Sequence, residues 1–214
     1  MQLGESMSTA PFHDPTATWN QRYSQEGYLF GTEPSRWLVS QRAWLPPNGR
    51  VLAVADGEGR NSVWMASQGF KVDAFDISEV AVAKARLLAA TQGVDVRYAV
   101  MDADAVQWPH AIYDAAVAIF VQFADPAARR RLFRHCAAAL KPGGVFLLHG
   151  YTPRQLEYRT GGPPIRSHLY TEDQLREELA GLSIELVEEF EDQLSEGSGH
   201  SGQSALIGLV ARRR

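Results

Sequence analysis

Val51-Leu52-Ala53-Val54-Ala55-Asp56-Gly57-Glu58-Gly59-Arg60-Asn61-Ser62 is an apolar run that breaks into a glycine-rich turn. A short apolar run bounded by glycine is typical of a buried parallel strand, and the Ala-, Trp- and Met-containing segment after Ser62 suits a helix packed on it. Gly57 and Gly59 let the backbone turn sharply and approach a ligand, while the next helix offers its N-terminal N–H groups. The stretch therefore predicts a strand, a ligand-binding turn and a helix.

Outward from this stretch, apolar runs alternate with helical stretches, which is typical of βαβ units and a parallel sheet. The strands expected after the first cover residues 72–75, 96–100, 115–120, 145–148, 183–190 and 205–211. Ser78, Asp125 and Thr171 are expected to cap the main helices between them. The polar, glycine-rich stretch 195–202 suits a loop joining an antiparallel hairpin. The predicted fold class is therefore α/β, a Rossmann-like, doubly wound, mostly parallel seven-stranded sheet with an antiparallel C-terminal hairpin strand.

The N-terminal part divides into two segments. Residues 1–15 mix Gly, Ser, Thr and Pro without periodicity, which indicates disorder. Residues 16–47 predict a helical cover, in which Thr18 caps a short helix bearing Trp19 and Tyr23, and a second helix is stopped by Pro46-Pro47. No internal repeat is visible, so we expect residues 16–214 to form a single domain.

Composition excludes several classes of function. The chain has 214 residues, 45% of them apolar and 21% charged, and a net charge of -4, which argues against a nucleic-acid-binding surface. The short triplets 129–131 and 212–214 are interpreted as a solvated helix face and a chain terminus. One cysteine, Cys136, and six scattered histidines predict neither a disulfide framework nor a metal site. With no apolar run of about 18 residues and no secretion signal, we expect a cytoplasmic protein.

The charge of the glycine turn bears on the cofactor. A Gly-x-Gly after a strand is common to several nucleoside cofactor sites. Asp56 and Glu58 flank Gly57, so a pyrophosphate would meet two carboxylates, and Ser62 stands where a dinucleotide site has a third glycine. S-adenosylmethionine is cationic at its sulfonium and amino groups and suits an acidic turn. A nicotinamide-dependent oxidoreductase stays open as the alternative.

Two further carboxylates follow successive strands. Asp76 ends the second strand, 19 positions after Gly57, where it is placed to accept hydrogen bonds from a ribose diol. Asp102 ends the third strand and is placed to accept from the adenine amino group, with Ala103 leaving room for the ring. Ligands of open α/β sheets bind along the carboxyl ends of the strands, so these residues predict one site.

Several motifs together resemble a known family. They are Trp19-Asn20-Gln21-Arg22-Tyr23, Phe30-Gly31-Thr32-Glu33-Pro34, the turn from Asp56 to Asn61, Ala74-Phe75-Asp76-Ile77-Ser78, Leu140-Lys141-Pro142-Gly143-Gly144, Thr160-Gly161-Gly162-Pro163-Pro164 and Glu196-Gly197-Ser198-Gly199-His200-Ser201-Gly202. Over residues 18–213 the chain resembles class I S-adenosylmethionine-dependent methyltransferases, in particular the small tellurite-resistance and thiopurine methyltransferase-like group. It departs from the commoner pattern at two positions. Ala53 stands where the group usually has an acidic residue, and Ala55 stands where it usually has the first glycine of the loop.

The resemblance implies a set of cofactor-binding residues. The turn brackets the methionine part, Asp76 and Ile77 hold the ribose, and the remaining positions contact adenine or line the site under a mobile N-terminal cover. The full set is Trp19, Tyr23, Asp56, Gly57, Glu58, Gly59, Asn61, Asp76, Ile77, Asp102, Ala103, Phe120 and Val121. Because Ala53 and Ala55 lack the usual groups, the methionine amino group must contact Asp56, Glu58 or backbone carbonyls.

Methyl transfer from a sulfonium is an in-line displacement, so the enzyme mainly aligns the nucleophile and excludes water. A thiol or a reduced chalcogen, such as a tellurite or selenite species, needs no strong general base. The candidate catalytic residues are Tyr151, Arg154 and His200; Tyr158 and Arg159 accompany the first two on a segment suited to an anionic substrate. We expect a monomer or homodimer acting on a small molecule. A non-catalytic S-adenosylmethionine-binding module is the alternative of a different class.

Overall fold

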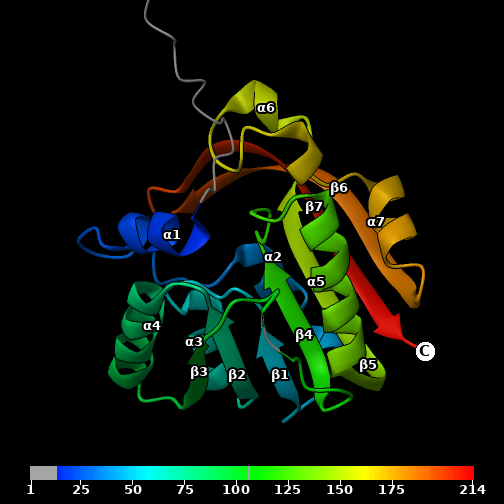
Figure 1. Cartoon of the computed structure of the whole chain (residues 1–214), viewed down its shortest axis with the longest axis horizontal. Helices are drawn as coiled ribbons and strands as arrows, with labels where there is room; N and C mark the ends of the chain where they lie inside the picture. Colours follow the sequence, from blue (N-terminus) through cyan, green and yellow to red (C-terminus); the bar gives the residue numbers. More distant parts are fainter. Residues whose placement is uncertain (1–13, 106) are drawn as a thin grey trace, which may run out of the picture.

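The computed structural model describes residues 14–105 and 107–214, and the expected disordered stretch therefore lies outside the described residues as far as residue 13. One seven-stranded sheet runs through it in the order β3-β2-β1-β4-β5-β7-β6 (Figure 1). Strands β1 to β5 pair in parallel, and β7 lies antiparallel between β5 and β6. The strands are β1 (Arg50–Ala53), β2 (Lys71–Asp76), β3 (Val96–Val100), β4 (Tyr113–Ile119), β5 (Leu140–Tyr151), β6 (Leu182–Glu196) and β7 (His200–Arg213). The predicted fold class is confirmed.

Helices cover both faces of the sheet. They are α1 (Pro15–Tyr23), α2 (Arg36–Ser40), α3 (Arg60–Ser67), α4 (Glu79–Gln92), α5 (Pro126–Ala139), α6 (Gln155–Tyr158) and α7 (Glu172–Glu178), with the 3-10 helices η1 (Arg42–Trp44) and η2 (Arg166–His168). Helices α2 and α3 pack on one face through Leu38 and Met65, and α5 and α7 pack on the other. Ser78, Asp125 and Thr171 cap α4, α5 and α7 as predicted.

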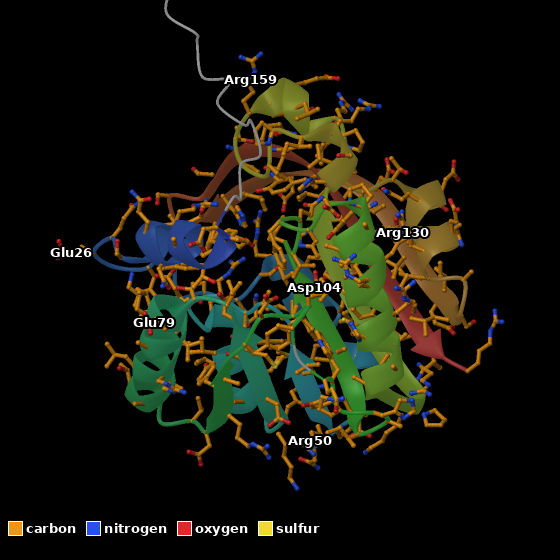
Figure 2. All side chains as sticks on the ribbon, in the orientation of Figure 1. Glu26, Arg50, Glu79, Asp104, Arg130 and Arg159 are labelled. Carbon is orange, nitrogen blue, oxygen red and sulfur yellow. The ribbon has the colours of Figure 1, made fainter. Side chains whose placement is uncertain are left out.

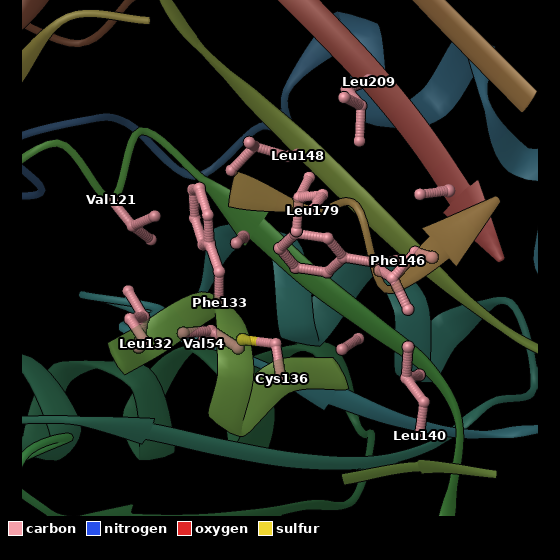
Figure 3. Close-up of a cluster of buried hydrophobic side chains, with 14 of the residues drawn as sticks. Val54, Val121, Leu132, Phe133, Cys136, Leu140, Phe146, Leu148, Leu179 and Leu209 are labelled. Atoms are coloured by element: carbon pink, nitrogen blue, oxygen red, sulfur yellow. The ribbon is translucent and has the colours of Figure 1, made fainter. Parts of the chain in front are cut away.

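The larger core lies between α5 and the sheet (Figure 3). Phe133 of α5 meets Phe146 of β5 edge to face, with ring centroids 5.8 Å apart, and the Cys136 thiol is fully buried beside them. Such aromatic pairs add to the stabilisation from apolar burial. This packing fixes the carboxyl ends of β4 and β5, and several residues that line the site lie at these ends.

The cover begins earlier than the sequence predicts. Asp14, and not Thr18, caps α1, since its Oδ1 accepts from the Ala17 N–H at 3.0 Å. Thr18 lies inside the helix and donates its hydroxyl to the Asp14 carbonyl at 2.8 Å. Proline has no N–H group, so at the first helical position it leaves no donor without a partner. Asp14-Pro15 is therefore a better helix start than Thr18. The expected cap at Thr18 is wrong.

The C-terminal hairpin is longer than predicted, and the expected loop at 195–202 is wrong. Strand pairing continues to Glu196 and His200, so the turn between the strands is only residues 197–199. The hairpin tip contacts the N-terminal segment, where the Gly199 N–H donates to the Leu29 carbonyl at 3.1 Å. A Cβ on Gly197 would lie 2.4 Å from the same carbonyl, so glycine is needed there for the close approach.

The arginine triplet at 129–131 is only partly a solvated helix face. Arg130 and Arg131 are exposed, and Figure 2 shows Arg130 on the outer side of α5. Arg129 is fully buried and donates two hydrogen bonds to Glu178 of α7, at 2.8 and 2.9 Å. Its Nη1 also donates to the Ser167 carbonyl at 2.8 Å. The expectation of a solvated face is therefore wrong for Arg129, which ties α5 to α7.

Candidate functional site

A cavity of about 560 Å³ lies at the carboxyl ends of the parallel strands, beneath α1. Its floor comes from the ends of β1, β2 and β4 and the loop after β3. Its roof comes from α1, residues 30–31, residues 162–164 and the hairpin tip at residues 199–200. A site of this volume takes a small molecule or a cofactor. The predicted placement at this sheet edge agrees with the cavity.

Asp76 lies at the centre of the floor. Its Oδ2 accepts from the Gly57 N–H at 2.9 Å, and its Oδ1 accepts from the Ser78 N–H at 2.9 Å. Burial raises the pKa of Asp76 to about 6, although the backbone hydrogen bonds from Ser78, Gly57 and Ile77 lower it. The side chain is 6% exposed, yet each oxygen keeps a lone pair for a ligand donor. Gly57 and Ile77 line the cavity beside it.

Asp56 follows β1 and is held from below by Ser62. The Ser62 hydroxyl donates to Asp56 Oδ2 and lies 2.8 Å from the Tyr98 hydroxyl. Burial raises the pKa of Asp56 to about 7, and the Ser62 hydrogen bond opposes this rise. Ser62, at the position where a dinucleotide site has glycine, therefore positions the first carboxylate of the turn.

The backbone leaves β1 through Ala55, which has a left-handed φ of 47°. This conformation is strained for a residue with a Cβ and explains why glycine is the commoner residue there in the group that the chain resembles. Ala53 points into the core on the α2 side of the sheet, 1% exposed, and therefore offers the cavity no polar group.

Glu58 holds the segment that follows α1. Its Oε2 accepts from the Leu29 N–H at 2.7 Å, and its Oε1 accepts from Lys84 Nζ at 2.9 Å. Lys84 also donates to the Gln25 and Gly27 carbonyls. Glu58 lines the cavity, but both of its oxygens already bind the protein. Of the two turn carboxylates, Asp56 is thus the better placed for a ligand.

Aromatic rings of the cover close the cavity above the glycine turn. Trp19 stacks on Tyr23 with centroids 5.4 Å apart, and Tyr23 meets Phe30 edge to face at 6.2 Å. A Cβ on Gly57 would lie 2.8 Å from the Tyr23 hydroxyl, so the turn packs directly against the cover. Asn61, the last residue of the predicted turn set, lines the cavity and accepts from the Ser35 N–H at 2.9 Å.

The loop after β3 forms the other end of the floor. Asp102 is exposed, and its Oδ1 accepts from the Asp104 N–H at 2.9 Å. The Ala103 carbonyl accepts from Trp108 Nε1 at 2.9 Å, which fixes the loop. Asp102 and Ala103 both line the cavity, together with Ile77 and Met101. The end of the cavity next to β3 is therefore apolar with a carboxylate at its rim.

His200 lies at the opposite end and is not on a flexible loop. It is 6% exposed and sits in a cluster of rings, with centroids 4.5 Å from Phe30, 4.2 Å from Phe120 and 5.6 Å from Tyr151. Phe120 reaches this cluster with a left-handed φ of 56°, a strained conformation of the kind found at functional sites. All four side chains line the cavity.

A buried ion pair stands behind His200. Arg60 Nη2 lies 2.7 Å from Glu196 Oε2, both side chains 7% exposed, and His200 Nδ1 lies 3.6 Å from the same oxygen. Burial by itself would raise the pKa of Glu196, but His200 and Arg60 lower it to about 2. Burial lowers the pKa of His200, against the opposing effect of Glu196. His200 is therefore a neutral base at neutral pH.

Other predicted residues lie away from the cavity. Gly59 starts α3 without reaching the lining, and Val121 is buried in the core below α5 (Figure 3). Arg154 forms an ion pair with Glu191 on β6 and stacks near Tyr158. Figure 2 shows Arg159 at the outer tip of the molecule. The segment 151–159 thus brings only Tyr151 into the cavity, and the arginines are not placed there for an anion.

Sequence reasoning missed Phe30, Arg60, Glu196 and Gln122 as parts of the site. Gln122 Nε2 donates to the Tyr151 carbonyl at 2.9 Å and its Oε1 accepts from the Tyr151 N–H at 2.6 Å, which fixes the strand end that carries Tyr151. Arg60 and Glu196 are 136 positions apart in the chain. The one sequence signal for this region is the motif Glu196-Gly197-Ser198-Gly199-His200, and it does not show that Arg60 is the partner of Glu196.

The charge of the cavity lining distinguishes between the two candidate cofactors. Six carboxylates, Asp56, Glu58, Asp76, Asp102, Asp104 and Asp125, line the cavity, against the guanidinium groups of Arg22 and Arg60. Arg60 is paired with Glu196, Glu58 with Lys84 and Asp104 with Arg131. The floor is therefore acidic, since four lining carboxylates have no ion-pair partner among the described residues: Asp56, Asp76, Asp102 and Asp125. An acidic floor fits a sulfonium with an amino group and opposes a pyrophosphate, which argues against the nicotinamide alternative. In the described part of the chain no group of three or more His, Cys, Asp or Glu side chains is placed to hold a metal.

Comparisons with known proteins agree with this geometry. Residues 51–144 match the model of a methyltransferase domain. No curated protein matches the chain in sequence. None of the helices in residues 14–105 and 107–214 has the length and apolar character needed to span a membrane.

Three solved structures share the fold. One, from work on the conversion of a disulfide bond into a thioacetal group during echinomycin biosynthesis, has a TM-score of 0.77 at 20% identity and covers 92% of this chain and 91% of its own. An S-adenosylmethionine-dependent methyltransferase from Methanosarcina mazei has a TM-score of 0.69 at 19% identity, covering 85% and 98%. TehB from Haemophilus influenzae has a TM-score of 0.64 at 18% identity, covering 83% and 61%.

Proposed function

We propose that the chain methylates a small molecule at a thiol or a reduced chalcogen, with S-adenosylmethionine as the methyl donor. Residues 51–144 match the model of a methyltransferase domain, and the acidic cavity floor suits a cationic sulfonium. Thiols and reduced chalcogens are the acceptors expected from the resemblance to the tellurite-resistance and thiopurine methyltransferase-like group. The observation that carries the proposal is the neutral, buried His200 among Phe30, Phe120 and Tyr151 at the end of the cavity away from Asp102. A small acceptor is favoured since α1 and the hairpin tip roof the cavity.

Each of three residues on the cavity floor binds a different part of the cofactor. Asp76 accepts from the ribose diol, Asp102 accepts from the adenine amino group at the rim, and Asp56 faces the methionine amino group. Carboxylate hydrogen bonds of this kind are the stronger, charge-assisted type. When bound, the cofactor supplies a methyl group on a positively charged sulfur, which is the electrophile of the reaction.

The acceptor end provides a base and excludes water. His200 Nδ1 faces Glu196, so Nε2 is the nitrogen left to accept the proton of an acceptor S–H group. The surrounding rings keep water from the nucleophile and hold it in line with the methyl group. Glu196 and Arg60 position His200, because Arg60 pairs with Glu196 Oε2 at 2.7 Å and His200 Nδ1 lies 3.6 Å from the same oxygen.

The N-terminal segment of residues 16–47 serves as the cover of a single domain spanning residues 16–214. Its contact with the hairpin tip rests on the Gly199 N–H and Leu29 carbonyl hydrogen bond and on the rings of Tyr23 and Phe30. The cover is also tied to the domain where the Leu29 N–H donates to Glu58, the Ser35 N–H donates to Asn61, and Lys84 donates to the Gln25 and Gly27 carbonyls. Opening of the cover for ligand exchange therefore breaks these hydrogen bonds. The acidic net charge and lone cysteine favour a cytoplasmic monomer or homodimer without nucleic-acid binding.

Two measurements test the proposed function. Calorimetry with S-adenosylhomocysteine is expected to give micromolar binding, and transfer of labelled methyl groups is expected with a panel of aliphatic and aromatic thiols, selenide and tellurite. Binding without transfer to any acceptor would favour the non-catalytic binding module. Absence of binding by the intact protein would reject both readings.

The raised pKa values predict pH-dependent cofactor binding. Asp56 and Asp76 have pKa values of about 7 and about 6, so both become protonated as the pH falls toward about 5.5. A protonated carboxyl no longer attracts a cationic ligand, so affinity for S-adenosylhomocysteine, whose amino group is cationic, is expected to fall roughly tenfold between about pH 8 and about pH 5.5. Calorimetry at constant ionic strength measures this fall. Asp56→Asn is expected to flatten the upper part of the curve, and an unchanged curve in that variant would contradict the role given to Asp56.

A further inference from the structure

A second cavity lies behind the site, between α2 and strands β5, β6 and β7. Its volume is about 320 Å³. The lining comes from Arg36, Trp37 and Ser40 of α2, His149 of β5, Glu188, Phe190, Asp192, Leu194 and Glu196 of β6, and Leu206 of β7. Glu196 and His149 form the wall between this cavity and the first, because they contact Arg60, His200 and Phe120, which line the first cavity.

One part of the lining is aromatic. The ring of His149 is parallel to the indole of Trp37, with centroids 5.0 Å apart and an interplanar angle of 16°, and to the ring of Phe190 at 5.9 Å and 1°. His149 is buried against both rings, with 1% of its surface exposed. Parallel π faces of Trp and Phe attract planar cations.

Two buried polar groups in the wall lack a hydrogen-bond partner within the described residues. Both ring nitrogens of His149 are unpaired, and so is Oε1 of Glu196, which is 8% exposed. Burial lowers the pKa of His149 to about 3, so the ring is neutral and offers one donor and one acceptor. A buried carboxylate oxygen without a hydrogen-bond donor is destabilising, so a ligand that supplies a donor is favoured at this position.

Three carboxylates and one guanidinium line this cavity, and one of the carboxylates has no ion-pair partner among the described residues. Asp192 is paired with Arg36 at 2.6 Å, and Glu196 is paired with Arg60 at 2.7 Å. Glu188 accepts from Trp37 Nε1 at 3.1 Å, a neutral donor, and in the described part of the chain no cation pairs with it. A ligand with N–H donors and a positive charge would satisfy Glu188 and Glu196 Oε1 together.

We propose that this second cavity is a binding site for a small planar organic cation of the amidinium or guanidinium class. Its N–H groups donate to Glu196 Oε1 and Glu188, and its flat face lies against the aromatic lining that Trp37, His149 and Phe190 form together. Water would satisfy the hydrogen bonds but would leave the charge of Glu188 and the aromatic surface without a partner. The second cavity is distinct from the first, and the wall formed by Glu196 and His149 separates the two. The proposal does not depend on the identity of the methyl acceptor.

Calorimetry with benzamidinium chloride tests the site on the wild-type protein. Saturable binding with a Kd of about 1 mM or lower is expected, and the neutral isostere benzamide is expected to bind at least about tenfold more weakly. The titration is repeated with S-adenosylhomocysteine as a competitor, which is not expected to displace benzamidinium. No saturable binding up to about 10 mM, equal binding of benzamide, or displacement by S-adenosylhomocysteine would overturn the proposal.

Matched variants on β6 locate the binding. Glu188→Gln removes the surplus charge and is expected to weaken benzamidinium binding about fivefold to tenfold. Glu189→Gln, on the adjacent exposed residue outside the lining, is expected to leave the Kd within about twofold. Equal affinities of the two variants would also overturn the proposal. Failure of methyl transfer with an intact benzamidinium site would concern only the proposed function.

Discussion

Replacing Asp76 by alanine is expected to weaken S-adenosylhomocysteine binding about a hundredfold, or roughly 2.7 kcal/mol. The substitution removes the acceptors for the ribose diol, each hydrogen bond to a charged group being worth about 1.5 to 3 kcal/mol. It also removes the acceptor of the Gly57 and Ser78 N–H groups, both at 2.9 Å, which hold the glycine turn against β2. Calorimetry on the folded variant measures the loss.

Two control variants separate the loss of the Asp76 charge from a general disturbance of strand β2. Asp76→Asn keeps one oxygen acceptor and the shape of the side chain, so it is expected to lose about tenfold in affinity. Asp73→Asn lies on the same strand, where Asp73 pairs with Arg50 and Arg97 outside the cavity, and is expected to bind like wild type. If a folded Asp76→Ala protein binds with wild-type affinity, the ribose assignment is wrong.

Replacing His200 by alanine is expected to lower kcat about a hundredfold with a thiol acceptor, the lower end of the usual range for a general base. The Kd of S-adenosylhomocysteine is expected to stay within about twofold, because His200 lies at the acceptor end with Phe120 and Tyr151. Steady-state kinetics and calorimetry on the same preparation measure both quantities.

The pH profile distinguishes a base from a packing residue. Wild-type kcat is expected to decline at low pH as His200 becomes protonated, below the ordinary histidine value of about 6.5 because burial lowers its pKa. His200→Gln keeps the size of the side chain but is expected to lose this limb of the profile. His110→Ala, on an exposed loop, serves as the matched control. A hundredfold loss of kcat with an unchanged profile in His200→Gln would assign His200 to packing.

The sheet was predictable because its signals are local. The strand at residues 96–100 coincides with β3, and the caps at Ser78, Asp125 and Thr171 act as expected. Two of the errors in the predicted fold have tertiary causes. The hairpin residues 195–202 have the composition of a loop, yet they extend as strands because the tip packs against Leu29. Arg129 belongs to a charged triplet, but Glu178 of α7 provides a partner that no local pattern shows.

The site was predictable only where the strand ends define it. Asp56, Asp76 and Asp102 follow three strands that pair in parallel, so their common edge follows from the order of the chain. His200 was named as a candidate, but its burial and its partners depend on contacts with residues as distant as Arg60. Arg154 was named for its charge, and the neighbouring Glu191 on β6 keeps it at the surface. The charge of a residue alone does not show whether its side chain points into the cavity or toward the surface.

The place of β7 between β5 and β6 has a consequence for synthesis on the ribosome. Strand β6 is hydrogen-bonded only to β7, so residues 182–196 have no partner in the sheet until residues 200–213 have been made. The carboxylates at Asp56 and Asp76 emerge long before His200 and the hairpin tip that closes over them. The residues of the hairpin tip that roof the cavity, Gly199 and His200, are therefore among the last parts of the site to be made. Closure of the site around the cofactor follows translation of β7, which makes ligand retention a direct report of finished folding.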